Sequence, residues 1–375
     1  MPRSPAQGPL AVFASFSGTG GVERMLINLI RGFADLGQSV ELVLVRAQSP
    51  HLRRLPESVR QVQLGASHTL LAAPALALYL RERRPAALLA AKDRAGRTAV
   101  LARALARTQT PIGLRLGTHL STAMAHRSAL ARALRYLPIR LLYPRIDRIL
   151  AVSQGVADDT VRIARLPRGA VQVIRNPVIT PELAAQAAAP CPHPWLAAGA
   201  VPVIVAAGRL QRQKDFPTLI RAFARVRAGR ECRLLILGEG AARPGLEALV
   251  AELGLGAEVD LAAFQSNPYP FLARAALFVL SSAWEGSPNV LTEALALGVP
   301  VVSTDCPSGP AELLDQGRFG PLVPVGDWAA LAAAMERTLD HPLPAVVLKS
   351  AVSEYEQGHS ARRYLEALGL AADPF

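Results

Sequence analysis

Residues 281–305 read SSAWEGSPNVLTEALALGVPVVSTD, and this stretch predicts the fold of the second half of the chain. The apolar run Ala275–Leu280 before it is typical of a buried strand. Glycine and proline then mark a turn, Asn289 is placed to cap a helix over residues 290–297, and a new strand begins at Val301. The order strand, loop, helix, strand is typical of an α/β protein with a parallel sheet.

The same stretch carries two carboxylates in positions suited to ligand binding. Glu285 lies in the loop before the helix, and Glu293 lies about one turn inside it. The start of a helix presents free N–H groups and the positive end of its dipole, which favour a phosphate. Carboxylates also accept hydrogen bonds from sugar hydroxyls. Taken alone, each glutamate is more simply a solvated residue, and this alternative stays open.

The run from Glu285 to Glu293, continued by ALALGVPVVS up to Ser303, resembles the E-x7-E signature of retaining glycosyltransferases of family GT4. The resemblance implies that Glu285 contacts the donor sugar and Glu293 the nucleotide ribose. It extends over about residues 10–339. It also implies donor contacts for the residues between the two glutamates, which are Gly286, Ser287, Pro288, Asn289, Val290 and Leu291.

The fold implied by this resemblance is GT-B, an α/β fold with two Rossmann-like, doubly wound parallel-sheet domains that face each other across a cleft. The chain is long enough for two domains, with 375 residues. We expect an N-terminal acceptor-binding domain over 1–180, a proline- and alanine-rich linker over 181–200, a nucleotide-sugar-binding domain over 201–345, and a last helical segment, 346–375, that crosses back to the first domain.

A glycine-rich turn, residues 17–21, follows the first predicted strand and precedes a helix. Its spacing is not G-x-G-x-x-G, and no acidic residue ends the next strand, so a nicotinamide site is disfavoured. Gly20 and Gly21 resemble the N-terminal loop of the GT4 family, which implies a donor contact. An ordinary tight turn is the alternative.

Three further residues follow predicted strands of the first domain, at the edge where open α/β sheets bind ligands. Lys92 and Arg94 come after the strand Ala86–Ala91 and are predicted to contact phosphate or acceptor, with a solvated loop as the alternative. His119 follows the strand Pro111–Leu116. It is either a structural histidine or, as the resemblance implies, a catalytic residue that borders the donor sugar.

Two cations lie five residues apart on the first strand-to-helix connection of the second domain, Arg209 and Lys214. Both can reach a diphosphate there, and the sequence around them resembles the GT4 pair that binds the donor diphosphate. We predict Arg209, Lys214 and Glu285 as catalytic residues because the leaving diphosphate needs electrostatic stabilisation. Gly238 is predicted to border the nucleotide base.

The charge is unevenly distributed along the chain. Residues 1–180 carry 26 arginines and lysines against 9 acidic residues, and the remainder carries 15 against 20. A basic first half suggests an anionic partner such as a membrane surface, a lipid diphosphate or nucleic acid. Residues 126–148 interleave arginine and leucine with breaks expected at Pro138 and Pro144. This segment either lies on an anionic membrane or packs on the core with a solvated arginine face; no nucleic-acid motif is present.

The three cysteines, Cys191, Cys232 and Cys306, are far apart and are predicted to be reduced thiols. No apolar run reaches the length of a membrane-spanning helix, and we expect no signal peptide. We therefore expect a cytoplasmic protein, peripheral on the inner face of the cytoplasmic membrane. The sequence has no D-x-D pair, so we expect neither a metal site nor a cofactor.

Together these features predict a retaining, metal-independent hexosyltransferase that uses a nucleotide-diphospho sugar, in the first place a UDP-sugar. The expected acceptor is a lipid-linked saccharide of cell-envelope polysaccharide or glycan synthesis. The alternatives are a nucleotide-sugar epimerase on the same fold and a non-catalytic subunit that binds a partner or a membrane. The sequence does not identify the sugar, the acceptor or the oligomeric state.

Overall fold

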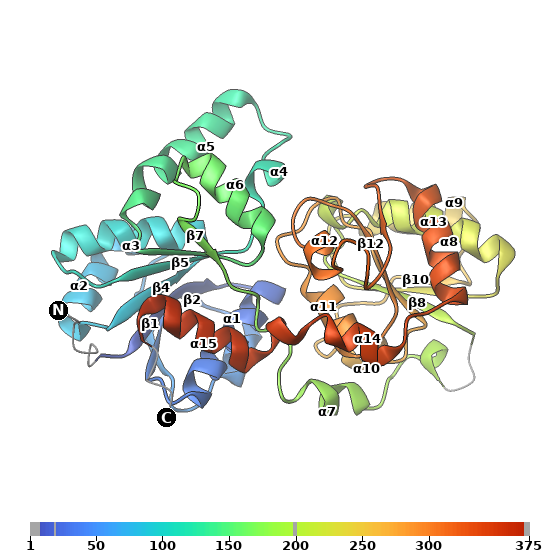
Figure 1. The fold of residues 1–375 in the computed structure, drawn as a ribbon, viewed down its shortest axis with the longest axis horizontal. Helices are drawn as coiled ribbons and strands as arrows, with labels where there is room; N and C mark the ends of the chain where they lie inside the picture. The colour runs from blue at the N-terminus through green and yellow to red at the C-terminus, as the bar shows by residue number, and fades with distance from the viewer. Residues whose placement is uncertain (1–7, 19, 198–200, 371–375) are drawn as a thin grey trace. The chain divides into compact units, whose positions relative to one another are not determined.

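The computed structural model describes residues 8–18, 20–197 and 201–370. Four parts of the chain lie outside the described residues. They are residues 1–7, Thr19 of the glycine-rich turn, residues 198–200 of the expected linker, and residues 371–375 of the expected last helical segment. The chain divides into two compact units (Figure 1), Met1–Val178 with Glu354–Phe375 and Ile179–Ser353. Each unit holds one parallel sheet, which confirms the predicted class of two parallel-sheet α/β domains.

Unit 1 contains a seven-stranded sheet in the order β3-β2-β1-β4-β5-β6-β7, and every neighbouring pair is parallel. The central strands are nearly continuous apolar runs because helices cover both faces of a parallel sheet. The strands are β1 Leu10–Phe16, β2 Val40–Ala47, β3 Arg60–Gln63, β4 Ala87–Ala91, β5 Ile112–Leu116, β6 Arg148–Ala151 and β7 Val171–Val173.

The helices of unit 1 pack in two layers. One core cluster joins the sheet to α2, α3, α5 and α6, and the other joins it to α1 and α15. Successive strand residues point to opposite faces, which is why Ala11 and Phe13 belong to one cluster while Leu10 and Val12 belong to the other. The helices are α1 Gly21–Asp35, α2 Ala73–Arg83, α3 Asp93–Ala106, α4 Leu120–Ala123, α5 Ala129–Leu142, α6 Gln154–Ala164 and α15 Gln357–Leu368.

Unit 2 contains a six-stranded parallel sheet in the order β10-β9-β8-β11-β12-β13. Its strands are β8 Val203–Ala207, β9 Arg233–Leu237, β10 Val259–Asp260, β11 Leu277–Leu280, β12 Val301–Thr304 and β13 Leu322–Val323. Its helices are α7 Leu183–Ala188, α8 Phe216–Gly229, α9 Arg243–Glu252, α10 Tyr269–Leu272, α11 Asn289–Ala296, α12 Pro310–Leu313, α13 Trp328–Asp340 and α14 Ala345–Ser350.

The strand order reverses at the same place in both sheets. In unit 1 the chain adds β2 and β3 on one side of β1, and then β4 to β7 on the other. In unit 2 it adds β9 and β10 on one side of β8, and then β11 to β13 on the other. In open α/β sheets, the connections that leave the carboxyl ends of the two strands at such a reversal diverge and form a crevice for a ligand. Each unit therefore has one preferred place for a binding site.

Three local expectations differ from the structure. Within the expected linker, α7 is a helix that packs against α10 in unit 2. Helix α5 continues through Pro138 and ends before Pro144, although an interior proline removes one N–H bond and its ring clashes with the carbonyl four residues before it. Asn289 is the first residue of α11 rather than its cap, a position that Pro288 occupies.

Helix α15, close to the end of the chain, belongs to unit 1 and packs against α1. The fit is close, since a Cβ atom on Gly113 of β5 would lie 2.5 Å from Leu368 Cδ2. Tyr364 is fully buried, and its ring meets that of Phe33 edge-on at 6.3 Å between centroids. The last helix is therefore an integral part of the core of unit 1.

We predict that Tyr364→Ala lowers the free energy of unfolding by roughly 3–5 kcal/mol, because it removes a large, fully buried ring. Arg363→Ala, on an exposed side of the same helix, is the matched control and should change it by less than about 0.5 kcal/mol. Calorimetric unfolding of the full chain measures both. Equal effects of the two substitutions would show that α15 is not anchored as described.

Candidate functional site

The first candidate site lies in unit 2, where the strand order reverses. Lys214 follows β8 and Glu285 follows β11, so they come from the connections on either side of the reversal. Their side chains form an ion pair with 2.6 Å between Lys214 Nζ and Glu285 Oε1, and only 15% and 7% of the two side chains are exposed. Removing either partner of such a pair is costly, because the remaining charge stays buried and uncompensated.

Further hydrogen bonds fix Glu285 and its loop. Ser282 Oγ donates to Glu285 Oε1 at 2.7 Å, and Gln213 Nε2 donates to the carbonyl of Trp284 at 2.8 Å. Thr304 Oγ1 at the end of β12 donates to the carbonyl of Ser282 at 2.6 Å. Sequence reasoning missed Gln213, Ser282 and Thr304 as supports of this site, since only the fold brings these three segments together.

Arg209, the second cation predicted to bind the diphosphate, has a different environment from Lys214. It is exposed, and it has no ion-pair or hydrogen-bond partner among the described residues. Its guanidinium therefore keeps a fork of N–H donors that matches the oxygens of a phosphate. The contacts of Arg209 and Lys214 with a diphosphate stay predictions.

Two glycines allow the connections of this site to approach each other closely. A Cβ atom on Gly208 would lie 2.8 Å from Lys214 Cε, so this glycine leaves room for the lysine chain that reaches Glu285. A Cβ atom on Gly238 would lie 2.0 Å from the Gly208 carbonyl oxygen, and Gly238 has a φ of 153°. Gly238 thus has a packing reason to be glycine, and its predicted contact with the base stays a prediction.

The loop that joins Glu285 to α11 carries an unsatisfied hydroxyl. Ser287 Oγ is buried and makes no hydrogen bond within the part of the chain that the structure describes. A buried hydroxyl without a partner costs free energy, and each such group calls for an explanation. Gly286 and Pro288 on either side of it are buried. A ligand oxygen at this point would complete the hydrogen bonding of Ser287.

The first turn of α11 offers fewer N–H groups than the sequence suggested. Asn289 N–H donates to the Ser287 carbonyl at 3.0 Å, and Leu291 N–H donates to the Pro288 carbonyl at 2.9 Å. Leu291 is also fully buried, so its position supports the helix rather than a direct ligand contact. The Val290 N–H makes no such bond among the described residues, and this group remains for an anion.

Glu293 lies in the second turn of α11 and is 2% exposed. The structure thus places the two glutamates of the signature on one loop and helix of unit 2, and both are buried.

Cys306 is buried close to Glu285. Burial, and then the charge of Glu285, raises the pKa of the Cys306 thiol to about 12, so the thiol stays protonated and unreactive at neutral pH.

The glycine-rich turn of unit 1 is organised by a residue that sequence reasoning missed. Gly20 precedes α1, Gly21 is its first residue, and both are exposed. Glu23 Oε1 accepts the N–H groups of Ser17 at 3.0 Å and of Gly18 at 3.2 Å. Glu23 reaches past the cap residue Gly20, and a glycine cap lacks the side chain of a capping box, so no sequence signal marked this contact. The predicted donor contacts of Gly20 and Gly21 stay predictions.

His119 makes its side-chain contacts with residues of unit 1. Its Nδ1 lies 2.9 Å from Thr122 Oγ1 and 3.7 Å from Asp159 Oδ2, and 16% of the side chain is exposed. These contacts match the structural alternative considered for this histidine. Its catalytic role stays a prediction.

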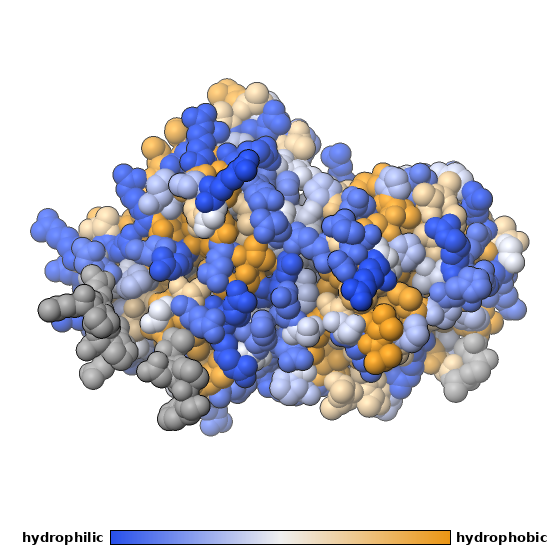
Figure 2. All heavy atoms as spheres, in the orientation of Figure 1, coloured by the Kyte–Doolittle hydropathy of each residue, from blue (hydrophilic) through white to orange (hydrophobic). Residues whose placement is uncertain are grey.

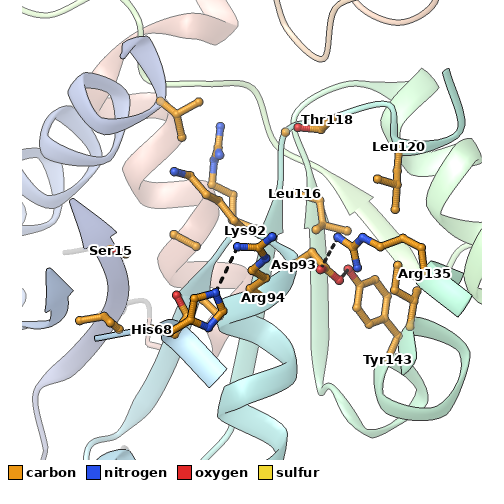
Figure 3. Close-up of a pocket in the computed structure, with 18 of the residues that line it drawn as sticks. Ser15, His68, Lys92, Asp93, Arg94, Leu116, Thr118, Leu120, Arg135 and Tyr143 are labelled. Atoms are coloured by element: carbon orange, nitrogen blue, oxygen red, sulfur yellow. Dashed lines mark hydrogen bonds and ion pairs between the residues drawn. The ribbon is translucent and has the colours of Figure 1, made fainter. Parts of the chain in front are cut away.

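The predicted acceptor residues Lys92 and Arg94 line a pocket of about 490 Å³ in unit 1. The pocket lies at the carboxyl ends of β1, β4 and β5, beside the reversal of the strand order. Figure 3 shows Arg94 beside His68 on one side of the pocket and Asp93 beside Arg135 on the other. Sequence reasoning missed His68 and Arg135, because neither lies in a recognisable motif.

Helix α5, the arginine- and leucine-rich segment, leaves four of its five leucines exposed. Leu130, Leu134, Leu137 and Leu141 are 70%, 64%, 52% and 55% exposed, and of the residues of α5 that the structure describes only Ile139 is buried. Spacings of four, three and four residues place the leucines on one stripe. Figure 2 shows apolar atoms among hydrophilic ones over the region that α5 occupies in Figure 1. The helix packs on the core of unit 1 through Tyr136, Ile139 and Leu142, and the leucine stripe takes no part in that packing.

No group of three or more metal-ligating side chains comes together in the residues that the structure describes. None of their helices combines the length and the apolar character needed to cross a membrane.

We predict that Gly238→Ala lowers the thermal unfolding midpoint of unit 2, because the new Cβ atom would lie 2.0 Å from the Gly208 carbonyl oxygen. Overpacking of this kind costs about 1–3 kcal/mol. Gly245→Ala in the same unit is the matched control, since a Cβ atom there meets open space. If calorimetry shows the same midpoint for both variants, the close approach of the two connections is wrong.

Comparison with known proteins gives the same family in both halves of the chain. A model described as Glycosyltransferase Family 4 matches residues 19–181. A model described as Glycosyl transferases group 1 matches residues 201–341. The two matches follow the division into two units.

Curated relatives match over shorter lengths. The Campylobacter jejuni N-acetylgalactosamine-N,N'-diacetylbacillosaminyl-diphospho-undecaprenol 4-alpha-N-acetylgalactosaminyltransferase is 34% identical over 202 residues, 54% of this chain and 53% of that protein. The lipopolysaccharide core biosynthesis glycosyltransferase LpsE of Rhizobium meliloti is 36% identical over 202 residues, 53% of this chain and 56% of that protein. The chain thus spans about half the length of the curated relatives it matches.

Among solved structures, Anabaena HepE in complex with UDP-glucose is similar with a TM-score of 0.76 and 19% identity, over 97% of this chain and 100% of that chain. A similarity at this level of sequence identity shows that the two proteins share a fold. The fold and the two family matches agree with the signature between Glu285 and Glu293. With the first model matching one unit and the second model the other, the chain belongs to the family 4 and group 1 glycosyltransferases and has the GT-B fold.

Proposed function

We propose that this protein transfers a hexose from a UDP-sugar to a lipid-linked saccharide in the synthesis of a cell-envelope polysaccharide or glycan. The observation that carries the proposal is the arrangement in unit 2, where the buried Lys214–Glu285 pair lies at the reversal of the strand order. The exposed guanidinium of Arg209 and the unsatisfied hydroxyl of Ser287 belong to the same connections. These groups suit a sugar attached to a diphosphate.

Each group has a distinct task in this mechanism. Glu285, held by Lys214 and Ser282, accepts hydrogen bonds from the hydroxyls of the donor sugar. Arg209 and the Val290 N–H stabilise the negative charge that grows on the departing diphosphate. Because the start of α11 fixes the Val290 N–H before the reaction, this donor needs little reorganisation as the bond to the sugar breaks.

Three finer features belong to the proposal. UDP as the nucleotide is supported by HepE, a protein of the same fold that was solved with UDP-glucose. Retention of the anomeric configuration is what the family resemblance implies, and NMR of the product's anomeric proton tests it. Metal independence follows from the lack of a D-x-D pair in the sequence and from the cations that can replace a metal; activity in EDTA tests it.

The acceptor is proposed from relatives and from charge. The name of the Campylobacter jejuni relative specifies a saccharide on diphospho-undecaprenol, and LpsE is named for lipopolysaccharide core synthesis. The basic first half of this chain suits such an acceptor and the anionic surface in which it lies. We therefore place the protein in the cytoplasm, peripheral on the inner face of the membrane.

Helix α5 is the part of unit 1 best suited to that surface. Its four exposed leucines can enter the boundary between headgroups and acyl chains. Residues 126–146 contain five arginines and no acidic residue, so the segment is attracted to anionic lipids. The leucine stripe and the arginines together favour a membrane surface over solvent.

We predict that UDP raises the thermal unfolding midpoint, since a ligand that binds only the folded chain stabilises it. Arg209→Ala should reduce kcat/KM by about 10²–10³-fold, the usual loss for one donor to a developing charge. Arg212→Ala, an exposed arginine on the same connection, is the control and should stay within about twofold of the unchanged chain. Equal activities of the two variants would remove Arg209 from the mechanism.

The same assay distinguishes the proposal from its alternatives. An epimerase converts the UDP-sugar when no acceptor is present, whereas a transferase needs the acceptor. A non-catalytic subunit gives no shift with UDP, GDP or ADP. Either result would overturn the proposed activity.

We predict that the chain binds vesicles that contain anionic lipid and that salt weakens this binding. The double substitution Leu134→Ser with Leu137→Ser should weaken it at least about tenfold, because burial of a leucine side chain is worth about 1.5–3 kcal/mol. Leu101→Ser with Leu105→Ser on α3 is the control, as both leucines are exposed there too. Cosedimentation measures the binding, and equal loss in both variants would show that α5 is not the contact.

A further inference from the structure

The pocket of unit 1 has an unusual balance of charge. Five arginine or lysine residues and one carboxylate line it, a formal excess of four positive charges. The carboxylate, Asp93, is already engaged: its Oδ2 accepts from Arg97 at 2.9 Å and from Arg135 at 2.7 Å, and its Oδ1 accepts from the Tyr143 hydroxyl at 3.0 Å. The basic residues of the lining are Arg46, Lys92, Arg94, Arg115 and Arg135.

One of these charges is buried without a carboxylate to balance it. Arg115 is 2% exposed, and no carboxylate lies within ion-pair distance of it in the part of the chain that the structure describes. Its NH2 group donates to Asn176 Oδ1 at 2.7 Å, a neutral partner. Its guanidinium lies beside Gly117, another lining residue. A buried charge of this kind is expensive unless an opposite charge comes close.

The remaining cations come from three elements of unit 1: β2, the start of α3, and α5. Arg46 lies near the end of β2, and its Nε and NH2 groups donate to the Ser67 carbonyl at 3.1 and 2.8 Å. This contact fixes the segment that carries His68, whose Nε2 lies 3.4 Å from an Arg94 nitrogen (Figure 3). Lys92 occupies the cap of α3 with a φ of 78°. Convergence of cations on a helix start is the arrangement that binds phosphates.

We infer that this pocket binds the phosphate or diphosphate group of the acceptor, with Arg46 and His68 as contacts beyond the predicted Lys92 and Arg94. That the phosphate belongs to the acceptor rests on the proposed function, whereas the affinity for phosphate does not. A diphosphate carries two or more negative charges and so matches the excess of positive charge better than a single carboxylate does. The pocket is large enough, at about 490 Å³, to hold the group and part of what is attached to it.

The test is calorimetric titration of the full chain with inorganic pyrophosphate while UDP saturates the donor site. We expect saturable binding that falls at least tenfold in the double variant Arg46→Gln with Arg94→Gln. The control, Arg53→Gln with Arg81→Gln, removes the same charge from exposed positions outside the pocket and should stay within twofold. The affinity for UDP should stay within twofold in both variants, which shows that they are folded.

Three outcomes would overturn the inference: no saturable binding of pyrophosphate, an equal loss in the control, or tighter binding of glucuronate than of pyrophosphate. Failure of UDP to bind would instead count against the proposed function. In that case the pyrophosphate titration is repeated in the Arg209→Ala chain, where it reports on the pocket alone.

A second arm identifies the source of the phosphate. A short isoprenyl diphosphate that binds at least tenfold more tightly than pyrophosphate would support a lipid-linked acceptor. Equal affinities would support a soluble phosphorylated saccharide. Both results support the phosphate pocket, and both require the loss of affinity in the Arg46 and Arg94 variant.

Discussion

The buried ion pair between Lys214 and Glu285 is the interaction on which the candidate donor site depends. It joins the connection after β8 to the connection after β11, so it crosses the point at which the strand order reverses. Gly208 leaves space for the lysine chain, Ser282 donates to the carboxylate, and Gln213 donates to the adjacent carbonyl of Trp284. A charge pair that is nearly inaccessible to water holds its geometry well, because any loosening would leave an unpaired charge in the interior. This rigidity is what a site for a developing charge requires.

Unit 1 uses the same sheet topology for a different chemical purpose. Its reversal, between β1 and β4, opens onto a pocket rich in cations, whereas the reversal in unit 2 carries a charge-balanced pair. Helix α5 links this pocket to the proposed membrane contact, because Arg135 and Ile139 line the pocket while its leucine stripe is exposed. The basic charge of the first half thus has two proposed uses within one unit, in the phosphate pocket and on α5.

Sequence reasoning succeeded where the information is local. The run from Glu285 to Glu293 and the glycine and lysine around Arg209 carry a family pattern, and strand and helix periods predicted the parallel sheets. It left two alternatives open for residues 126–148, because the helical pattern suits both; only the structure shows that Ile139 and Leu142 pack on the core while four other leucines are exposed. Leu291 is a similar case, since a motif position cannot reveal that the residue is fully buried. Sequence reasoning did not identify Gln213, Ser282 and Thr304, because a hydrogen bond between distant segments has no sequence pattern in either segment.

The sequence by itself determined the family and the α/β class. It also identified the charged residues that are predicted to bind a diphosphate. It could do so because turn chemistry, hydrophobic period and short motifs act over a few residues. The tertiary structure alone decided the strand order, and with it which connections meet at each reversal. It therefore decided that Lys214 pairs with Glu285 while Arg209 stays exposed, and that Arg46, His68 and Arg94 surround one pocket. Contacts between residues far apart in the chain depend on how a sheet is assembled, and that assembly is a property of the whole unit.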